Sequence, residues 1–129
     1  MQRTLSLLVA IAVALTLLLA SVLLAQPVKV FERMGKVARI DTQERVVVIE
    51  DQLYQLSTSA VSVYTYDPNI TDPQAMRSAE RRQSLSTIRQ NMQVGFNVEK
   101  HGQLEQVVEF WILTPEGLKA LKDSAKREQ

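Results

Sequence analysis

Side chains that commonly carry catalysis or bind metals are few in this chain of 129 residues and lie far apart. There is one histidine, His101, and no cysteine. A metal site or a nucleophilic triad needs several such groups held together. His101 precedes Gly102, a pair typical of an exposed hairpin turn. Glu50 and Asp51 are adjacent, but they fall in an expected turn and lack the burial that raises a carboxyl pKa. The sequence therefore predicts no catalytic residue and no metal site.

The glycines and the net charge exclude two further classes of protein. The four glycines are scattered along the chain, so they form no glycine-rich phosphate loop. The chain has 15 Lys+Arg against 14 Asp+Glu, whereas nucleic-acid-binding proteins usually carry a marked basic excess. We therefore expect no nucleic-acid partner, no cofactor and no enzymatic activity.

Protein contact is the remaining role, and five side chains are candidates for it. Arg77, Arg81 and Arg82 fall in a helix predicted over residues 74–83, where positions four apart share a face. They could present a basic patch to an acidic partner or to anionic lipid, or form a solvated helix face. Tyr64 and Tyr66 precede an Asp-Pro loop and are expected to be exposed contact anchors, with packing at a strand edge as the alternative.

An apolar run from Leu5 to Ala25 indicates where the protein works. Arg3 precedes the run and Gln26-Pro27 follows it. Such a run is recognised for export, either as a cleaved signal peptide or as an uncleaved anchor long enough to span a bilayer. We expect residues 1–25 to be this leader or anchor. The rest of the chain is then periplasmic, soluble after cleavage or tethered to the inner membrane through residues 5–25.

The chain after the leader predicts a small β-domain. Residues 26–34 are expected to be a linker, 35–115 a β-domain with a loop or helix insertion at 66–83, and 116–129 a terminal helix and tail. Alternating or β-branched segments predict strands over residues 35–40, 45–50, 53–56, 61–65, 93–99 and 106–113. The strand 61–65 is a candidate edge for pairing with a partner strand. The strand 106–113 is expected to be apolar on both faces, with Val108, Phe110 and Ile112 on one face and Val107, Glu109 and Trp111 on the other. We therefore expect it at a barrel seam or under a covering element.

This order of strands predicts a mainly β fold, either a small antiparallel curled sheet or a five-stranded barrel of the oligonucleotide-binding (OB) type. A simple meander is the alternative topology. One helical insertion and a short C-terminal helix complete the expected architecture. An exported barrel that binds a small ligand or an oligosaccharide is the alternative function, and it requires a shallow aromatic-lined pocket on the curved face.

Several segments together resemble a known family. After the leader come Gly35-Lys-Val-Ala-Arg-Ile-Asp, a valine-rich strand and Leu53-Tyr-Gln-Leu. Met92-Gln-Val-Gly-Phe follows Leu85, and Val107-Val-Glu-Phe-Trp-Ile-Leu-Thr-Pro closes the domain. This order resembles the small periplasmic accessory proteins of type IV pilus biogenesis that are encoded beside the pilus-tip adhesin. The resemblance implies a protein component of the pilus assembly machine, or of another envelope complex, as the partner. It transfers no catalytic or ligand-binding residue.

Overall fold

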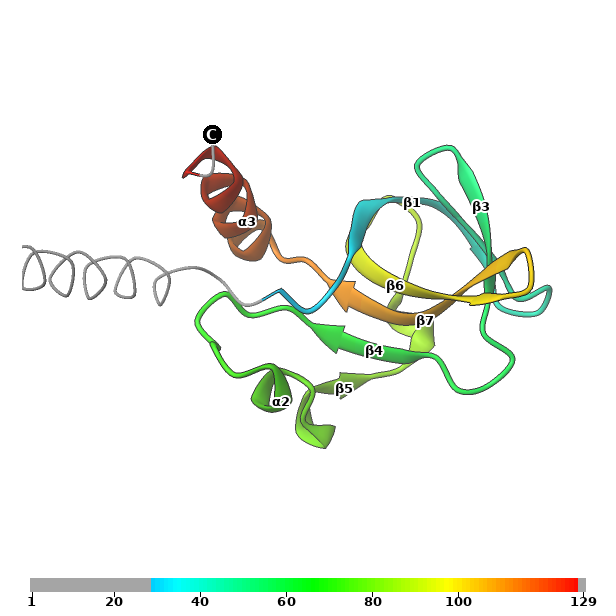
Figure 1. Cartoon of the computed structure of the whole chain (residues 1–129), viewed down its shortest axis with the longest axis horizontal. Helices are drawn as coiled ribbons and strands as arrows, with labels where there is room; N and C mark the ends of the chain where they lie inside the picture. The colour runs from blue at the N-terminus through cyan, green and yellow to red at the C-terminus, as the bar shows by residue number, and fades with distance from the viewer. Residues whose placement is uncertain (1–28, 128–129) are drawn as a thin grey trace, which may run out of the picture.

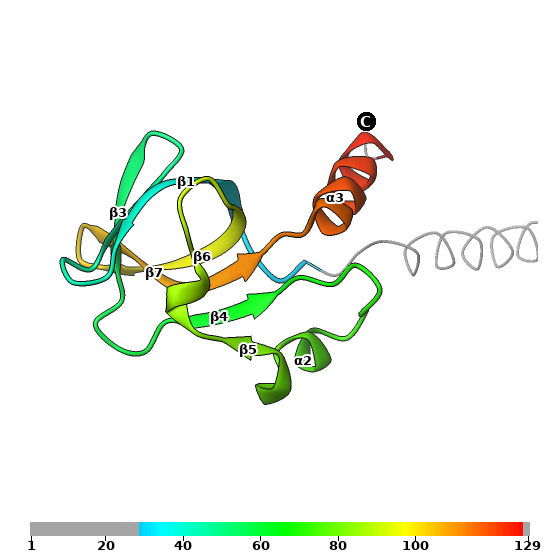
Figure 2. The ribbon, with the colours of Figure 1, turned by 180° about the vertical axis from the view of Figure 1, so that it is seen from behind.

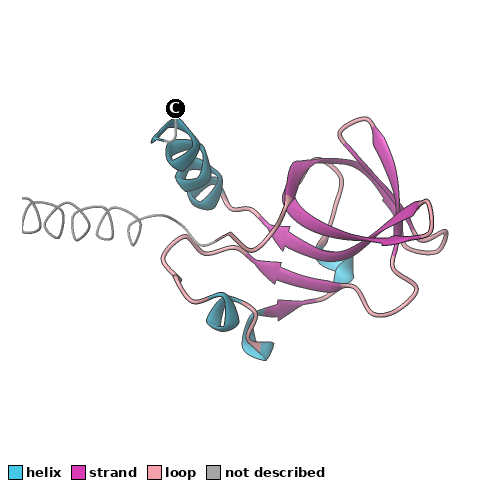
Figure 3. Cartoon of the chain, viewed as in Figure 1, coloured by secondary structure: helices cyan, strands magenta, loops and turns pink. Residues whose placement is uncertain are grey.

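The structure, a computed structural model, describes residues 29–127, so the predicted leader (1–25) and the first residues of the predicted linker (26–28) lie outside the described part. Its strands are β1 (Arg33–Asp41), β2 (Val46–Ile49), β3 (Gln52–Leu56), β4 (Ser62–Thr65), β5 (Arg82–Gln83), β6 (Gln93–His101) and β7 (Leu104–Ile112). Its helices are α2 (Pro73–Met76) and α3 (Pro115–Arg127), with 3-10 turns η1 (Ala79–Arg81) and η2 (Leu85–Thr87). Figure 3 shows that strands dominate.

Five strands close into a barrel in the order β3-β2-β1-β6-β7 (Figure 1). All neighbours along this order are antiparallel. A parallel pairing of β3 with β7, through Gln55↔Gln106 and Leu56↔Val107, closes the circle. This is the OB-type barrel expected from the sequence. The meander alternative is wrong, because β3 pairs with the last strand of the chain and not with the next one.

The side-chain pattern of the strands explains the barrel interior. In β2 the buried residues are Val47 and Ile49, and in β3 they are Tyr54 and Leu56, because alternate residues of a strand face the same side. We call the interior the barrel core, and its buried members are Val37, Val47, Ile49, Tyr54, Leu56, Val63, Ile88, Val94, Phe96, Val107 and Phe110. Asn91 adopts the left-handed conformation, with a φ of 75°, which a short amide side chain tolerates.

A β-bulge in β7 lets the side chains of this strand pack into two apolar clusters. Its register with β6 passes from Val98↔Val107 to Asn97↔Glu109, which leaves Val108 as the extra residue. Val107 and Phe110 therefore both lie in the barrel core. The expectation that Val107 and Phe110 occupy opposite faces is wrong, because the bulge shifts the alternation by one residue. The expected position at a barrel seam is confirmed, since β7 pairs with β6, β3 and β4.

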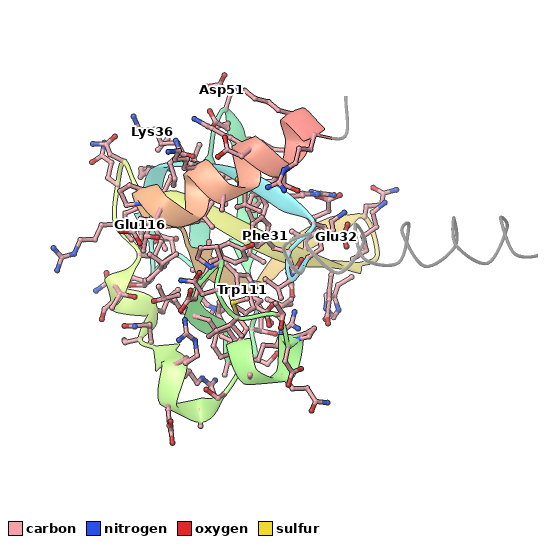
Figure 4. All side chains as sticks on the ribbon, turned by 90° about the vertical axis from the view of Figure 1, so that its left-hand side faces the viewer. Phe31, Glu32, Lys36, Asp51, Trp111 and Glu116 are labelled. Carbon is pink, nitrogen blue, oxygen red and sulfur yellow. The ribbon has the colours of Figure 1, made fainter. Side chains whose placement is uncertain are left out.

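A second apolar cluster lies outside the barrel, and we call it the outer cluster. Its buried members are Val30, Tyr64, Tyr66, Met76, Trp111 and Leu113. Leu118 and Leu121 of α3 pack against it. Figure 4 looks onto the end of the molecule where α3, Phe31 and Trp111 are found. Val30 falls in the predicted linker yet is buried, and Arg33 and Met34 already belong to β1.

The insertion between β3 and β6 differs most from the prediction. Asp72 caps a helix that begins at Pro73, but α2 ends at Met76. The helix predicted over 74–83 is therefore wrong beyond its first turn. Its apolar stripe is too thin to hold a longer helix against the domain. Arg82 and Gln83 pair with β4 instead.

The predicted edge strand is not an edge. Ser62–Thr65 pairs in parallel with β7 on one side and with β5 on the other. The view from behind shows β4 lying between β7 and β5 (Figure 2). The proposal that Val61 to Thr65 recruits a partner strand is therefore wrong, since both of its edges are occupied over Val63 and Tyr64.

Candidate functional site

The candidate site is a groove made of two adjoining hollows that share Gln52 and Tyr54. The first, of about 720 Å³, lies between the start of β1 and the turn that joins β2 to β3. The second, of about 430 Å³, lies between β3 and the β6–β7 hairpin, which meet at the right of Figure 1. We call the combined feature the groove.

Exposed apolar side chains converge on the groove. Among the described residues, the large apolar side chains that remain exposed are Met34, Leu53 and Leu104, with exposed fractions of 47%, 61% and 54%. Met34 lines the first hollow, and Leu53 and Leu104 line the second. Single exposed leucines are common on protein surfaces, but Leu53 and Leu104 line the same hollow, and exposed apolar side chains gathered at one place mark an interaction site. The groove is therefore the best candidate for contact with another molecule.

The elements around the groove hold it in place. The turn between β2 and β3 contains Glu50 with a φ of 53°, and its carboxylate accepts a hydrogen bond of 2.8 Å from the Lys36 N–H. Gly35 permits this close approach, because a Cβ there would lie 2.7 Å from Cγ2 of Ile49. Glu50 and Asp51 thus form an acidic end of the groove. Lys100 supplies a basic side chain on the wall formed by the β6–β7 hairpin.

An ion pair links the two hollows, because Arg33 lines the first and Glu105 lines the second. Arg33 donates two hydrogen bonds to the carboxylate of Glu105, and Nη2 lies 3.2 Å from Oε1. Its guanidinium also lies 5.9 Å from the ring centroid of Tyr54, which meets Phe96 edge to face at 5.2 Å. The bonds from Arg33 lower the pKa of Glu105, and the bonds to Glu105 raise the pKa of Arg33.

The lowered pKa of Glu105 gives a prediction for acid stability. A carboxyl whose pKa is lower in the folded state stabilises the fold above its unfolded pKa, and this contribution disappears as pH falls through the folded pKa. The free energies of unfolding of the wild type and of Glu105→Gln should therefore differ most at neutral pH and converge in acid. Denaturant titrations at several pH values measure this. Arg33→Gln should abolish the pH-dependent difference, and a difference that persists in the Arg33→Gln background would contradict the assignment.

The residues selected from the sequence lie elsewhere. Tyr64 and Tyr66 are 9% and 1% exposed, so the expectation that they are exposed anchors is wrong. Tyr64 stacks on Trp111 at 5.0 Å, because β4 lies beside β7. Tyr66 meets Phe31 edge to face at 5.8 Å. Its hydroxyl has no hydrogen-bond partner among the described residues, and burial raises the pKa of Tyr66.

The three arginines do not form one basic patch. Arg77 binds the carboxylate of Glu109 through Nη2 at 3.1 Å and through Nε at 3.3 Å. Arg81 donates to the Thr65 carbonyl at 2.9 Å. Arg82 lies exposed in β5. Because the predicted helix ends before these positions, the structure separates them, and Arg77 and Arg81 make contacts within the chain.

Arg77 belongs to a network around Glu109 that fixes the N-terminal segment. Oε1 of Glu109 also accepts hydrogen bonds from Asn97 Nδ2 at 2.9 Å and from Trp111 Nε1 at 2.7 Å. Arg77 and Asn97 both donate to the Val30 carbonyl, at 3.0 and 2.9 Å. This network holds the chain on its path into β1, so its role is structural.

His101 lies on the exposed end of the β6–β7 hairpin, as predicted, with Nε2 at 3.6 Å from a Glu99 carboxylate oxygen. Within residues 29–127 no group of three or more acidic, histidine or cysteine side chains could hold a metal ion. The same residues contain no helix long and apolar enough to cross a membrane.

Comparisons with protein-family models, with curated proteins and with solved structures found no match for this chain. The argument for a docking role therefore rests on the fold and the groove. The sequence did not point to the groove residues. The one available signal for the groove was the presence of two apolar residues, Leu53 and Leu104, beside predicted turns.

Proposed function

We propose that this protein is a non-enzymatic, exported accessory protein of type IV pilus assembly that acts by docking onto another protein of the cell envelope. The observation that carries the docking role is the convergence of Met34, Leu53 and Leu104 on one groove. Burying exposed apolar surface is the main favourable term in protein association. The pilus role rests on the resemblance in sequence, and export rests on the apolar run from Leu5 to Ala25.

The docking role predicts the effect of charging the groove. In a strain lacking the gene, the wild-type protein should restore surface pili and twitching, whereas Leu53→Asp/Leu104→Asp should not. Both side chains are exposed, so substitutions there should change stability by no more than about 0.5 kcal/mol each. Pili are counted by electron microscopy and in sheared surface fractions.

Thr42→Asp/Ala125→Asp is the matched control, because it adds the same charge at exposed positions that do not line the groove. It should restore pili fully. Immunoblots must show equal amounts of all variants. Normal piliation in the deletion strain would remove the pilus role, and full activity of the groove variant would remove the docking site.

Export is tested independently of docking. A reporter enzyme that is active only in an oxidising compartment, fused to the C-terminus, should be active if residues 1–25 direct the domain out of the cytoplasm. N-terminal sequencing of the protein from the envelope fraction then distinguishes a cleaved leader from an uncleaved anchor. A silent reporter would contradict a periplasmic location.

One observation favours the alternative of a small-ligand or oligosaccharide site. The first hollow has Tyr54 and Phe96 in its lining, which is the aromatic lining that this alternative requires. However, Tyr54 and Phe96 are only 6% and 2% exposed, so little ring surface is free to stack on a sugar. The exposed surface is instead aliphatic, which favours a protein partner.

A further inference from the structure

The second hollow of the groove exists because β3 and β7 separate. Their parallel pairing covers Gln55↔Gln106 and Leu56↔Val107 and extends no further toward the start of either strand. In contrast, β3 stays paired with β2 along its whole length. Leu53 and Leu104 therefore lie on either side of the hollow, on strands that are no longer joined.

The backbone of Leu53 has a free edge toward this hollow. The Leu56 N–H donates to the carbonyl of Arg45, the residue before β2, so Leu56 and Arg45 form a hydrogen-bonded pair that extends the β2–β3 ladder. Hydrogen-bonded pairs alternate with non-hydrogen-bonded pairs in an antiparallel ladder. The pair Leu53↔Val48 is of the second kind, and the N–H and C=O of Leu53 point away from β2. Ser57 lies four residues after Leu53, so its backbone groups point in the same direction as those of Leu53. Its N–H donates to the Val107 carbonyl of β7, which shows that this direction is toward β7.

The surroundings of this edge specify what could occupy it. Leu53 and Leu104 give the second hollow an apolar lining, and Met34 lines the first hollow. Glu50 and Asp51 make one end acidic, and Lys100 makes the hairpin wall basic. Arg33 and Glu105 neutralise each other. An extended peptide matches all of these features, because its backbone satisfies the free edge while alternate side chains fill apolar pockets.

We propose, as a refinement that rests on the proposed function, that the groove binds an extended segment of the partner protein, which adds as a short strand to the free edge of β3 at Leu53. The bound segment carries alternating apolar residues, a basic residue opposite Glu50 and Asp51, and an acidic residue opposite Lys100. Leu53 donates one backbone hydrogen bond to the segment and accepts one from it.

Amide hydrogen exchange of the full-length chain in detergent micelles tests this directly. The probes are two synthetic hexapeptides of opposite charge order, acetyl-Lys-Val-Thr-Val-Thr-Glu-amide and acetyl-Glu-Val-Thr-Val-Thr-Lys-amide, at millimolar concentration. With at least one of them, exchange of the Leu53 amide should slow by about tenfold or more, because exchange requires the new hydrogen bond to open. The same peptides N-methylated on their four central residues should give no protection, since they lack the N–H donors of a strand.

Two variants separate backbone pairing from side-chain contact. Leu53→Ala should keep the binding and weaken it, whereas Leu53→Pro should abolish it, because proline lacks the N–H. Proline is tolerated where a strand N–H is unpaired, and circular dichroism must show that both variants fold. If Leu53→Pro fails to fold, the N-methylated peptides alone decide the question.

Four results would overturn the inference. Two concern the peptides: equal protection of Leu53 by N-methylated and unmodified peptides, or no protection by any peptide. The third is wild-type affinity in folded Leu53→Pro, and the fourth is a shift of the Tyr54 signals with the oligosaccharide maltohexaose alone, which would favour the sugar-binding alternative. The pilus role fails separately. A deletion strain without pili combined with no protection of Leu53 removes only this inference, whereas protection of Leu53 with normal piliation removes only the pilus role.

Discussion

Replacing Trp111 with alanine should lower the free energy of unfolding by about 3–5 kcal/mol, the usual cost of truncating a large buried aromatic side chain. Trp111 is fully buried. Its ring stacks on Tyr64 and carries the guanidinium of Arg77 at 5.3 Å. Removing it leaves a cavity between β4, β7 and the N-terminal segment. Since domains of this size are stable by about 5–15 kcal/mol, the variant should be partly or largely unfolded.

Denaturant titration followed by circular dichroism measures this loss, because Trp111 is the single tryptophan of the chain and the variant has no indole fluorescence. Leu104→Ala is the control, since its side chain is exposed and should change the stability by no more than about 0.5 kcal/mol. A loss of less than about 1 kcal/mol for Trp111→Ala would show that the outer cluster contributes little to the fold.

Replacing Glu109 with alanine should have the next largest effect, about 2–3 kcal/mol, because it leaves several donors without their acceptor. These donors are the Trp111 Nε1, the Asn97 amide and the Arg77 guanidinium. Trp111 is buried, so its N–H cannot easily turn to water. The side chain of Arg77 is 37% exposed, and water can therefore take over part of its bonding, which keeps the cost below that of a fully buried ion pair.

Glu109→Gln is the matched comparison. Glutamine keeps an oxygen that can accept from Trp111 and Asn97 and loses only the charge opposite Arg77, so we expect a cost of about 1 kcal/mol. The critical result is which of the two variants loses more stability. If Glu109→Gln is as destabilising as Glu109→Ala, the charge of Glu109 matters and its role as a shared acceptor does not.

The barrel could be predicted because its signals are local. Residues 46–49 are β-branched, and the alternation around Val94, Phe96 and Val98 places one side of β6 inward. These patterns are imposed by side chains that must face a common interior. The closing contact of β3 with β7 follows from the number of strands and from the need to bury both faces of the last one.

The insertion could not be predicted because its structure depends on distant partners. Helix propensity over 74–83 is high, but Met76 joins the outer cluster and Arg77 binds Glu109 of β7. Such tertiary contacts outweigh the small differences in propensity. Nothing near Tyr64 in the sequence indicates that β4 will lie parallel to β7 and bury this ring against Trp111.

The groove was missed for a related reason. Leu53 and Leu104 belong to strands that are distant in the sequence, and each one alone resembles an ordinary exposed residue. Only the closed barrel shows that they face the same hollow and that β3 and β7 have already separated there. Sequence patterns identify which residues face outward, but the partner of an outward-facing residue depends on the topology.

The many pairings of β7 have a consequence for the order of events during biosynthesis. One edge of this strand joins β3 and then β4, the other joins β6, and its bulge supplies side chains to both apolar clusters. Because β7 begins only at Leu104, a nascent polypeptide lacks the closing piece of its barrel until most of it has left the ribosome. Contacts between such remote segments also form slowly. The domain should therefore stay unfolded until late in synthesis, a delay that would suit passage through a narrow translocation channel under the export proposed above.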